Sequence, residues 1–237
     1  MKYKIPSLSS NSIYLGILLA SVGGFLDAYT YISRGGVFAN AQTGNMVLLA
    51  VKAANNDWRG ALHFIPPILA FILGVLVSEM VKIPHVREVL HSYRRSILIL
   101  ECIVLIIVGF LPKNVPSMAV TVCIAFVSSL QISTFNKLDK WAYNSTMTTG
   151  SLRTAAQAAY MAIKEHNAEA KKQFKEFFVI IISFIFGAFA GTFSTAHMGN
   201  PSIHIAGGAL VIAIILYHRD RGYLSETVKE KLKKTGI

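Results

Sequence analysis

Long apolar runs, separated by short polar segments, dominate the sequence and predict membrane-spanning helices. A helix needs about 20 apolar residues to cross the hydrocarbon core of a bilayer. The first run is too long for a signal peptide, and no small-residue cleavage site closes it. We therefore expect a span from each of six runs: Asn11–Ile32, Ala61–Val81, Arg95–Leu111, Pro116–Phe135, Phe174–Ser194 and Ile203–His218.

Two further segments are apolar but are poor candidates for complete spans. Thr43–Asn55 is apolar over about nine residues before Lys52, which covers about half a bilayer at about 1.5 Å of helical rise per residue. Thr148–Lys164 is longer, but it contains Arg153 and Gln157. We expect neither segment to face lipid along its whole length.

The distribution of Lys and Arg distinguishes two topologies for these short segments. If both segments return to the side from which they enter, and the amino terminus is cytoplasmic, most basic residues lie on the cytoplasmic side. If both segments cross instead, the basic loop Lys82–Arg95 moves outside, against the positive-inside rule. The rule therefore favours re-entrant helices with both termini cytoplasmic, and two complete crossings are the alternative. The re-entrant topology leaves few basic residues outside: Arg34, Lys52, Arg59 and Lys113.

The composition is typical of a membrane protein. Of 237 residues, 53% are hydrophobic and 15% are charged, whereas soluble domains carry roughly 25% charged residues. The net charge of +11 would suit nucleic acid, but the Lys and Arg residues lie mostly between apolar runs and not along one stripe. We therefore expect the lipid bilayer, and no nucleic acid, as a partner. Cys102 and Cys123 lie inside apolar runs and match no disulfide framework or metal-ligand spacing.

Under the re-entrant topology, the two halves of the chain repeat one order of elements. In each half, a span leads to a polar turn and a Thr-Gly pair that begins a short helix, at Thr43-Gly44-Asn45 and at Thr149-Gly150-Ser151. Two spans follow each short helix, and an odd number of spans per half would invert the second half. We predict one all-α transmembrane domain of six spans and two re-entrant helices, with repeats at about 11–112 and 116–218 and a basic cytoplasmic tail at 219–237. Coincidence is the alternative, because Thr-Gly is a common dipeptide.

Two sequence motifs carry a resemblance to a known family. Gly23–Leu49 reads GGFLDAYTYISRGGVFANAQTGNMVLL, with Gly-x-x-Asp-Ala, Gly-Gly-x-Phe and Thr-Gly-Asn elements, and two later segments read LQISTF and TMTTGSL. Over essentially the whole chain, the sequence resembles the YoaK-like family of bacterial integral membrane proteins, a family of unknown function. The resemblance implies a multi-pass protein of the cytoplasmic membrane and implies no substrate. The second motif departs from the family pattern at Ile132, where we expect a small polar residue after Gln131.

Two carboxylates inside predicted spans are candidates for chemistry. Asp27 lies about two thirds along the first span, where an ionised group costs about 2.5 to 3.5 kcal/mol to insert. Asp27 is either a proton- or cation-coupling carboxylate that faces a cavity, or a helix cap or structural hydrogen-bond acceptor near the external interface. Glu101 lies in LILECIVLII without a charged neighbour, so it must face the bundle interior or be protonated. Coupling and structural roles are both open for Glu101.

The two Thr-Gly segments are candidates for ligand binding. The start of a helix gathers free N–H groups and the positive end of the helix dipole, which suits a carboxylate, a phosphate or another small anion. Thr43–Asn45 would bring a hydroxyl and an amide to such a start, and Thr149–Ser151 would repeat the arrangement from the opposite face. Capping of the helix by Thr43 is the alternative. If the repeat is inverted, we expect the two segments to approach each other near the midplane.

Further polar residues are weaker candidates. If Arg153 is buried, it can pair with Asp27 or with an anionic ligand, and if its helix lies on the surface, it faces lipid phosphates. Asn40 and Gln131 are polar candidates for the same site. The segment Arg219–Lys234 predicts a basic surface helix attracted to anionic lipid, or a solvated tail.

The sequence favours a transport protein over an enzyme. It contains no phosphate-binding loop, no nucleophile elbow and no His-Glu-x-x-His motif, so we expect no catalysis, no metal and no cofactor. We predict a permeation protein or secondary transporter for an unidentified small solute or ion, which can be anionic. A non-transporting scaffold or stress-response protein and a channel are the alternatives, and a homo-oligomer is compatible with all three. Polar residues around a shared cavity would favour transport, a dry interior the scaffold, and a continuous pore the channel.

Overall fold

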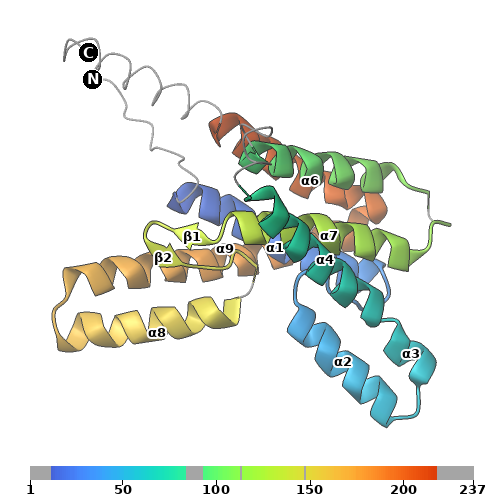
Figure 1. Cartoon of the computed structure of the whole chain (residues 1–237), viewed down its shortest axis with the longest axis horizontal. Helices are drawn as coiled ribbons and strands as arrows, with labels where there is room; N and C mark the ends of the chain where they lie inside the picture. The colour runs from blue at the N-terminus through green and yellow to red at the C-terminus, as the bar shows by residue number, and fades with distance from the viewer. Residues whose placement is uncertain (1–11, 84–92, 113, 147, 218–237) are drawn as a thin grey trace.

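The computed structural model describes residues 12–83, 93–112, 114–146 and 148–217 (Figure 1). A 3-10 turn, η1 (Asn200–Ser202), leads into the C-terminal helix at residues 203–217. The predicted basic tail and residues 84–92 of the loop expected between Lys82 and Arg95 lie outside the described residues. The other helices are α1 (Ile13–Ser33), α2 (Gln42–Ala54), α3 (Trp58–Leu62), α4 (Ile65–Val81), α6 (Tyr93–Phe110), α7 (Ser117–Thr134), α8 (Thr148–Lys164) and α9 (Ala168–Met198).

Within the described residues, five helical stretches are long and apolar enough to cross a membrane. They are α1, α3 with α4 (Trp58–Val81), α7, α9, and η1 with the C-terminal helix (Asn200–Tyr217). The remaining predicted span, Arg95–Leu111, corresponds to α6, whose 18 residues include the charged side chains of Arg94, Arg95 and Glu101. The chain is therefore a helical protein with several candidate membrane spans, and the count of six remains a prediction.

Local sequence signals explain where several helices begin. Asn167 caps α9, because its side-chain oxygen accepts hydrogen bonds from the backbone N–H groups of Glu169 and Ala170. This cap starts α9 before the predicted boundary at Phe174 and adds a charged first turn to the span. The predicted span Ala61–Val81 is divided at His63 and Phe64, and α4 then begins with prolines in its first turn, where proline is favoured.

A short β-hairpin is the one departure from the predicted all-helical fold in the part of the chain that the structure describes. Strands β1 (Lys137–Leu138) and β2 (Trp141–Ala142) pair antiparallel across a two-residue turn. Asp139 in this turn has a φ of 52°, a left-handed conformation that aspartate tolerates in tight hairpins. Ion pairs from Asp139 to Lys172 and from Lys140 to Glu169 join the turn to the first part of α9. The hairpin thus fixes the segment that leads into α8.

The helices of the two halves of the chain pack across each other. The first long helix, α1, packs against α9, and α7 packs against α4. Gly187 and Gly191 allow the close approach of α9 to α1, since a Cβ atom at Gly187 would lie 1.9 Å from the Ser21 carbonyl oxygen. Each short helix, in contrast, lies beside the helix that follows it, α2 beside α3 and α8 beside α9. Figure 1 shows these two pairs projecting from opposite ends of the bundle.

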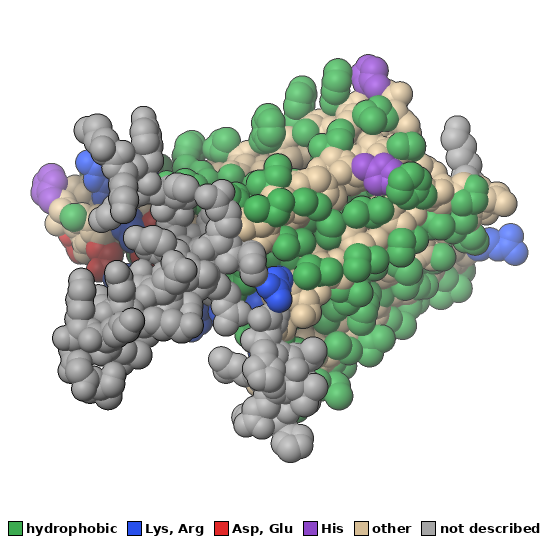
Figure 2. All heavy atoms as spheres, turned by 90° about the horizontal axis from the view of Figure 1, so that it is seen from above, with side chains coloured by type: hydrophobic (Ala, Val, Ile, Leu, Met, Phe, Trp, Pro, Cys, Tyr) green, Lys and Arg blue, Asp and Glu red, His purple; other side chains and the backbone are tan. Residues whose placement is uncertain are grey.

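Hydrophobic side chains cover much of the outer surface of the bundle. Figure 2 shows them over most of the described part of one face. Large side chains of α9 are among the most exposed, including Phe186 at 66% and Phe189 at 68%. Soluble monomers rarely expose apolar patches of this extent, so the surface fits contact with lipid.

Candidate functional site

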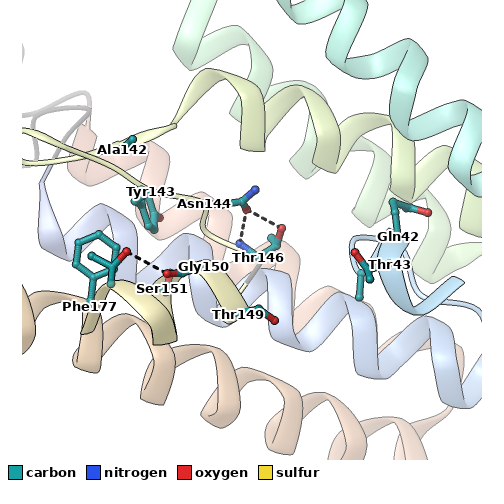
Figure 3. A pocket seen from close by; sticks show the side chains of 12 residues that line it. Gln42, Thr43, Ala142, Tyr143, Asn144, Thr146, Thr149, Gly150, Ser151 and Phe177 are labelled. Carbon is teal, nitrogen blue, oxygen red and sulfur yellow. Dashed lines mark hydrogen bonds between the residues drawn. The ribbon is translucent and has the colours of Figure 1, made fainter. Parts of the chain in front are cut away.

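The starts of α2 and α8, which are far apart in the sequence, line one cavity of about 460 Å³ (Figure 3). The structure therefore brings Thr43 of the first Thr-Gly segment to the same place as Thr149, Gly150 and Ser151 of the second. The described residues that line it are mostly polar, and none of them is Lys, Arg, Asp or Glu: Ala41, Gln42, Thr43, Ala142, Tyr143, Asn144, Thr146, Thr149, Gly150, Ser151, Thr154 and Phe177.

The wall on the α8 side is held by hydrogen bonds inside the loop after β2. The side-chain oxygen of Asn144 accepts from the backbone N–H of Thr146 at 3.0 Å and from its hydroxyl at 3.2 Å, as Figure 3 shows. Tyr143 lies next to them, and its hydroxyl donates to the carbonyl oxygen of Gly16. Burial raises the pKa of the Tyr143 phenol further above its already high ordinary value.

The wall on the α2 side begins at Ala41, which is the N-cap residue and provides no side-chain cap. The alternative that Thr43 caps the helix is therefore wrong, because Thr43 already lies inside the first turn. Instead, the carboxylate of Asp27 on α1 accepts hydrogen bonds from the backbone just before this helix. Asp27 Oδ1 accepts from the backbone N–H of Asn40 at 2.7 Å and of Ala41 at 3.3 Å. A negative group at this position also interacts favourably with the α2 dipole.

Asn45 and Gly44 lie away from the cavity lining. The Asn45 side chain accepts from the Phe38 backbone N–H at 2.9 Å and donates to the Phe38 carbonyl at 2.8 Å. Its amide also donates to Gln42 Oε1 at 2.9 Å. Gly44 lies under the Phe38 ring, where a Cβ atom would approach within 3.0 Å. Both residues of the predicted binding segment therefore shape the turn between α1 and α2.

Asp27 and Asn40 form a buried polar pair behind the start of α2. Asp27 is 5% exposed and Asn40 is fully buried. The Asn40 amide nitrogen donates to the carbonyl oxygen of Gly23 at 3.3 Å. Asp27 Oδ2 and Asn40 Oδ1 have no hydrogen-bond partner among the described residues. The pair thus contains two buried acceptor oxygens that the described chain leaves unsatisfied.

The other predicted site residues are not among those that line the cavity. Glu101 on α6 is fully buried and accepts a hydrogen bond from the Ser128 hydroxyl at 3.3 Å. Gln131 on α7 is also buried, and its amide nitrogen has no partner in the described part of the chain. Arg153 is exposed on α8, which corresponds to the surface alternative and not to a pair with buried Asp27. Over the same residues, no cluster of three or more His, Cys, Asp or Glu side chains is arranged to hold a metal.

One buried charge and eight of the twelve residues that line the cavity are not among the predicted site residues. Arg34, counted above among the external basic residues, is only 2% exposed. Its Nη2 donates to the Tyr29 hydroxyl at 2.7 Å, and its guanidinium lies 5.5 Å from the centre of that ring. Nothing in the local pattern distinguishes Arg34 from a solvated loop residue. Gln42 and Thr146 were detectable, because they lie immediately beside the two Thr-Gly segments.

Comparisons with known proteins agree with a membrane protein and name no activity. The profile of a family described as "Protein of unknown function (DUF1275)" matches residues 15–216. The UPF0700 transmembrane protein YoaK of Bacillus subtilis (strain 168) is 25% identical over 138 residues, which make up 57% of this chain and 61% of YoaK. The match therefore spans about three fifths of the length of that relative. No solved structure matches this chain.

Proposed function

We propose that this chain, which belongs to the DUF1275 family of proteins of unknown function, is a multi-pass membrane transporter for a small solute with one anionic group. A single observation carries the proposal: the starts of two short helices from different halves of the chain line one cavity, and most residues around it have polar side chains. In many secondary transporters, the solute binds where discontinuous helices begin. The hydroxyl and amide groups around this cavity favour transport over the alternative of a scaffold with a dry interior.

The chemistry of the cavity wall supports an anionic group on the solute. Each helix start carries the equivalent of roughly half a positive charge. At α2 this charge already interacts with Asp27, whereas no acidic residue is among the described residues that line the α8 side. Hydroxyl groups of Thr43, Thr149 and Ser151 add donors around the same space. The cavity volume of about 460 Å³ lies in the range of small-molecule sites.

The same proposal includes six spans, two re-entrant helices and an inverted repeat. Reciprocal packing supports the repeat, because α1 contacts α9 in the way that α7 contacts α4. The two short helices project from opposite ends of the bundle, as an inverted repeat requires (Figure 1). The buried position of Glu101 supports a place for α6 inside the bundle as the sixth span.

Cysteine labelling tests this topology with two matched sites. In a chain with Cys102→Ser and Cys123→Ser, we introduce Asn55→Cys after α2 or Glu165→Cys after α8; both original side chains are exposed. A membrane-impermeant maleimide should label Asn55→Cys in intact cells and Glu165→Cys only after permeabilisation. Labelling of both sites from one side would reject the inverted repeat.

A ligand-stabilisation screen tests the solute class. The purified protein is heated with panels of small carboxylates, phosphates, polyols and amines, and we expect increases in Tm from the anionic panels. Thr43→Val and Thr149→Val each remove a hydroxyl from the cavity wall, which should weaken binding of the best compound by about tenfold, or about 1.4 kcal/mol.

The matched control is Thr192→Val, because Thr192 is exposed on α9 and is not among the cavity-lining residues. This variant should bind the same compound with unchanged affinity. A screen in which only polyols or amines raise Tm would reject the anionic solute. Equal weakening of binding in all three variants would place the ligand outside this cavity.

A further inference from the structure

Two unsatisfied oxygen atoms lie in the buried pair Asp27–Asn40, beside the cavity and not among its lining residues. Asp27 Oδ2 and Asn40 Oδ1 are both hydrogen-bond acceptors, and neither has a partner among the described residues. The two residues are joined through the Asn40 N–H, which donates to Asp27 Oδ1 at 2.7 Å. Leaving such groups unsatisfied in a buried position costs about 1 to 3 kcal/mol each, and more for a charged group. A bound cation would satisfy both oxygens, whereas a proton on the Asp27 carboxyl is the alternative that the test below distinguishes.

From this pair we infer a binding site for a single Na⁺ ion, with Asp27 Oδ2 and Asn40 Oδ1 as two of its ligands. Carboxylate and amide oxygens are the ligands that hard cations prefer. The carbonyl oxygen of Gly23, which accepts from the Asn40 amide, is a neighbouring backbone oxygen of the same chemistry. Irregular backbone next to discontinuous helices is where Na⁺ is held in transporters of known architecture.

Charge balance favours a monovalent ion over a divalent one. One carboxylate and one Na⁺ sum to zero net charge, whereas a divalent ion would leave an uncompensated positive charge in a buried site. Divalent ions also require six or more oxygen ligands, commonly from several carboxylates, whereas this pair contains one carboxylate, that of Asp27.

The position of Gly23 connects the proposed ion to the cavity. Its carbonyl oxygen accepts from Asn40 on one side. Its Cα faces Thr146 on the other side, so closely that an added Cβ atom would lie 2.3 Å from the Thr146 methyl group. Thr146 lines the cavity, and Asp27 holds the backbone N–H of Ala41, which also lines it. An ion at Asp27 and Asn40 would therefore fix both walls of the cavity at once.

The inference rests on the buried pair and not on the proposed transport, so it is tested without a solute. The purified full chain in nanodiscs is heated in NaCl, KCl or choline chloride at equal ionic strength, and unfolding is followed by tryptophan fluorescence. Wild-type protein should show a saturable rise in Tm with Na⁺ alone, of about 5 to 10 °C at a hundred times the dissociation constant. Absence of a Na⁺-specific rise in the wild type would overturn the inference.

Two variants locate the ion, and one serves as a control. Asp27→Asn should lose the Na⁺ response, and Asn40→Ser should raise the apparent dissociation constant at least tenfold. Glu101→Gln should keep the full response, because Glu101 is the matched case of a buried carboxylate with one unpartnered oxygen.

If Asp27→Asn does not fold, the wild type and Asn40→Ser decide the outcome. A full Na⁺ response in Asp27→Asn or Asn40→Ser, or a Tm that follows pH and not Na⁺, would reject the site. A Na⁺ response combined with a failed solute screen would reject the transporter proposal alone.

Discussion

The Gly187→Ala variant is expected to lose about 3 kcal/mol or more of its free energy of unfolding. A Cβ atom at this position would lie 1.9 Å from the carbonyl oxygen of Ser21 on α1. Overpacking against side chains typically costs about 1 to 3 kcal/mol, and here the obstacle is backbone that cannot rotate away. Helices α1 and α9 would have to separate, which also disturbs the contact of Gly24 with the Phe184 carbonyl on the same interface.

Thermal unfolding in detergent measures this effect, and Gly208→Ala is the matched control. A loss of about 3 kcal/mol corresponds to a decrease in Tm of about 6 to 12 °C for a chain of this size. Gly208 lies in the C-terminal helix with no atom within 4 Å of an added Cβ, so alanine there should leave Tm unchanged or raise it slightly. Equal Tm values for the two variants would contradict the close packing of α1 on α9.

Asn45→Ala is expected to release the turn between α1 and α2. The alanine removes the partners of both the Phe38 N–H and the Phe38 carbonyl, which are partly buried. It also removes the amide that donates to Gln42 Oε1, a buried side chain in the cavity wall. Losing three hydrogen bonds and leaving their partners unpaired should cost about 2 to 4 kcal/mol, so the position of α2 becomes less well defined.

Limited proteolysis and Tm together test this second result. We expect faster cleavage in the Gly35–Gln42 segment and a decrease in Tm of about 4 to 16 °C. Asn55→Ala is the matched control, because the exposed Asn55 side chain donates only to the Val51 carbonyl of its own helix. Cleavage of Asn45→Ala at the wild-type rate would show that the turn is held by other contacts.

The apolar runs locate most helices of this protein, whereas caps and prolines set the ends of α9 and α4. The bounds of the two short helices are predicted most closely. Thr148–Lys164 is predicted with the bounds that α8 has, and Thr43–Asn55 differs from α2 by one residue at each end. The two Thr-Gly segments also line one cavity, which is the placement expected if the two halves repeat one order of elements.

The hydrogen bonds in the turn between α1 and α2 could not be predicted in the same way. Asp27, Asn40 and Asn45 are visible in the sequence as polar residues, but their roles depend on which backbone groups the turn leaves unpaired. Arg34 is buried only because Tyr29 offers its hydroxyl and ring at the end of α1. The β-hairpin was also missed, since two-residue strands have no hydrophobic period and Asp139 supports a left-handed turn only in context.

Under the proposed topology, the length of α9 sets the depth of the cavity in the bilayer. Its 31 residues reach about 46 Å, which is about 16 Å longer than a hydrocarbon core of about 30 Å. With α9 along the membrane normal, its charged first turns project into the aqueous phase by that distance. Under the proposed re-entrant topology, the 17 residues of α8 return about 26 Å from the same tip, which would place Thr149 about 10 Å below the hydrocarbon surface. A solute of the proposed kind, once bound there, would have left the headgroup region and would have about two thirds of the hydrophobic barrier still ahead of it.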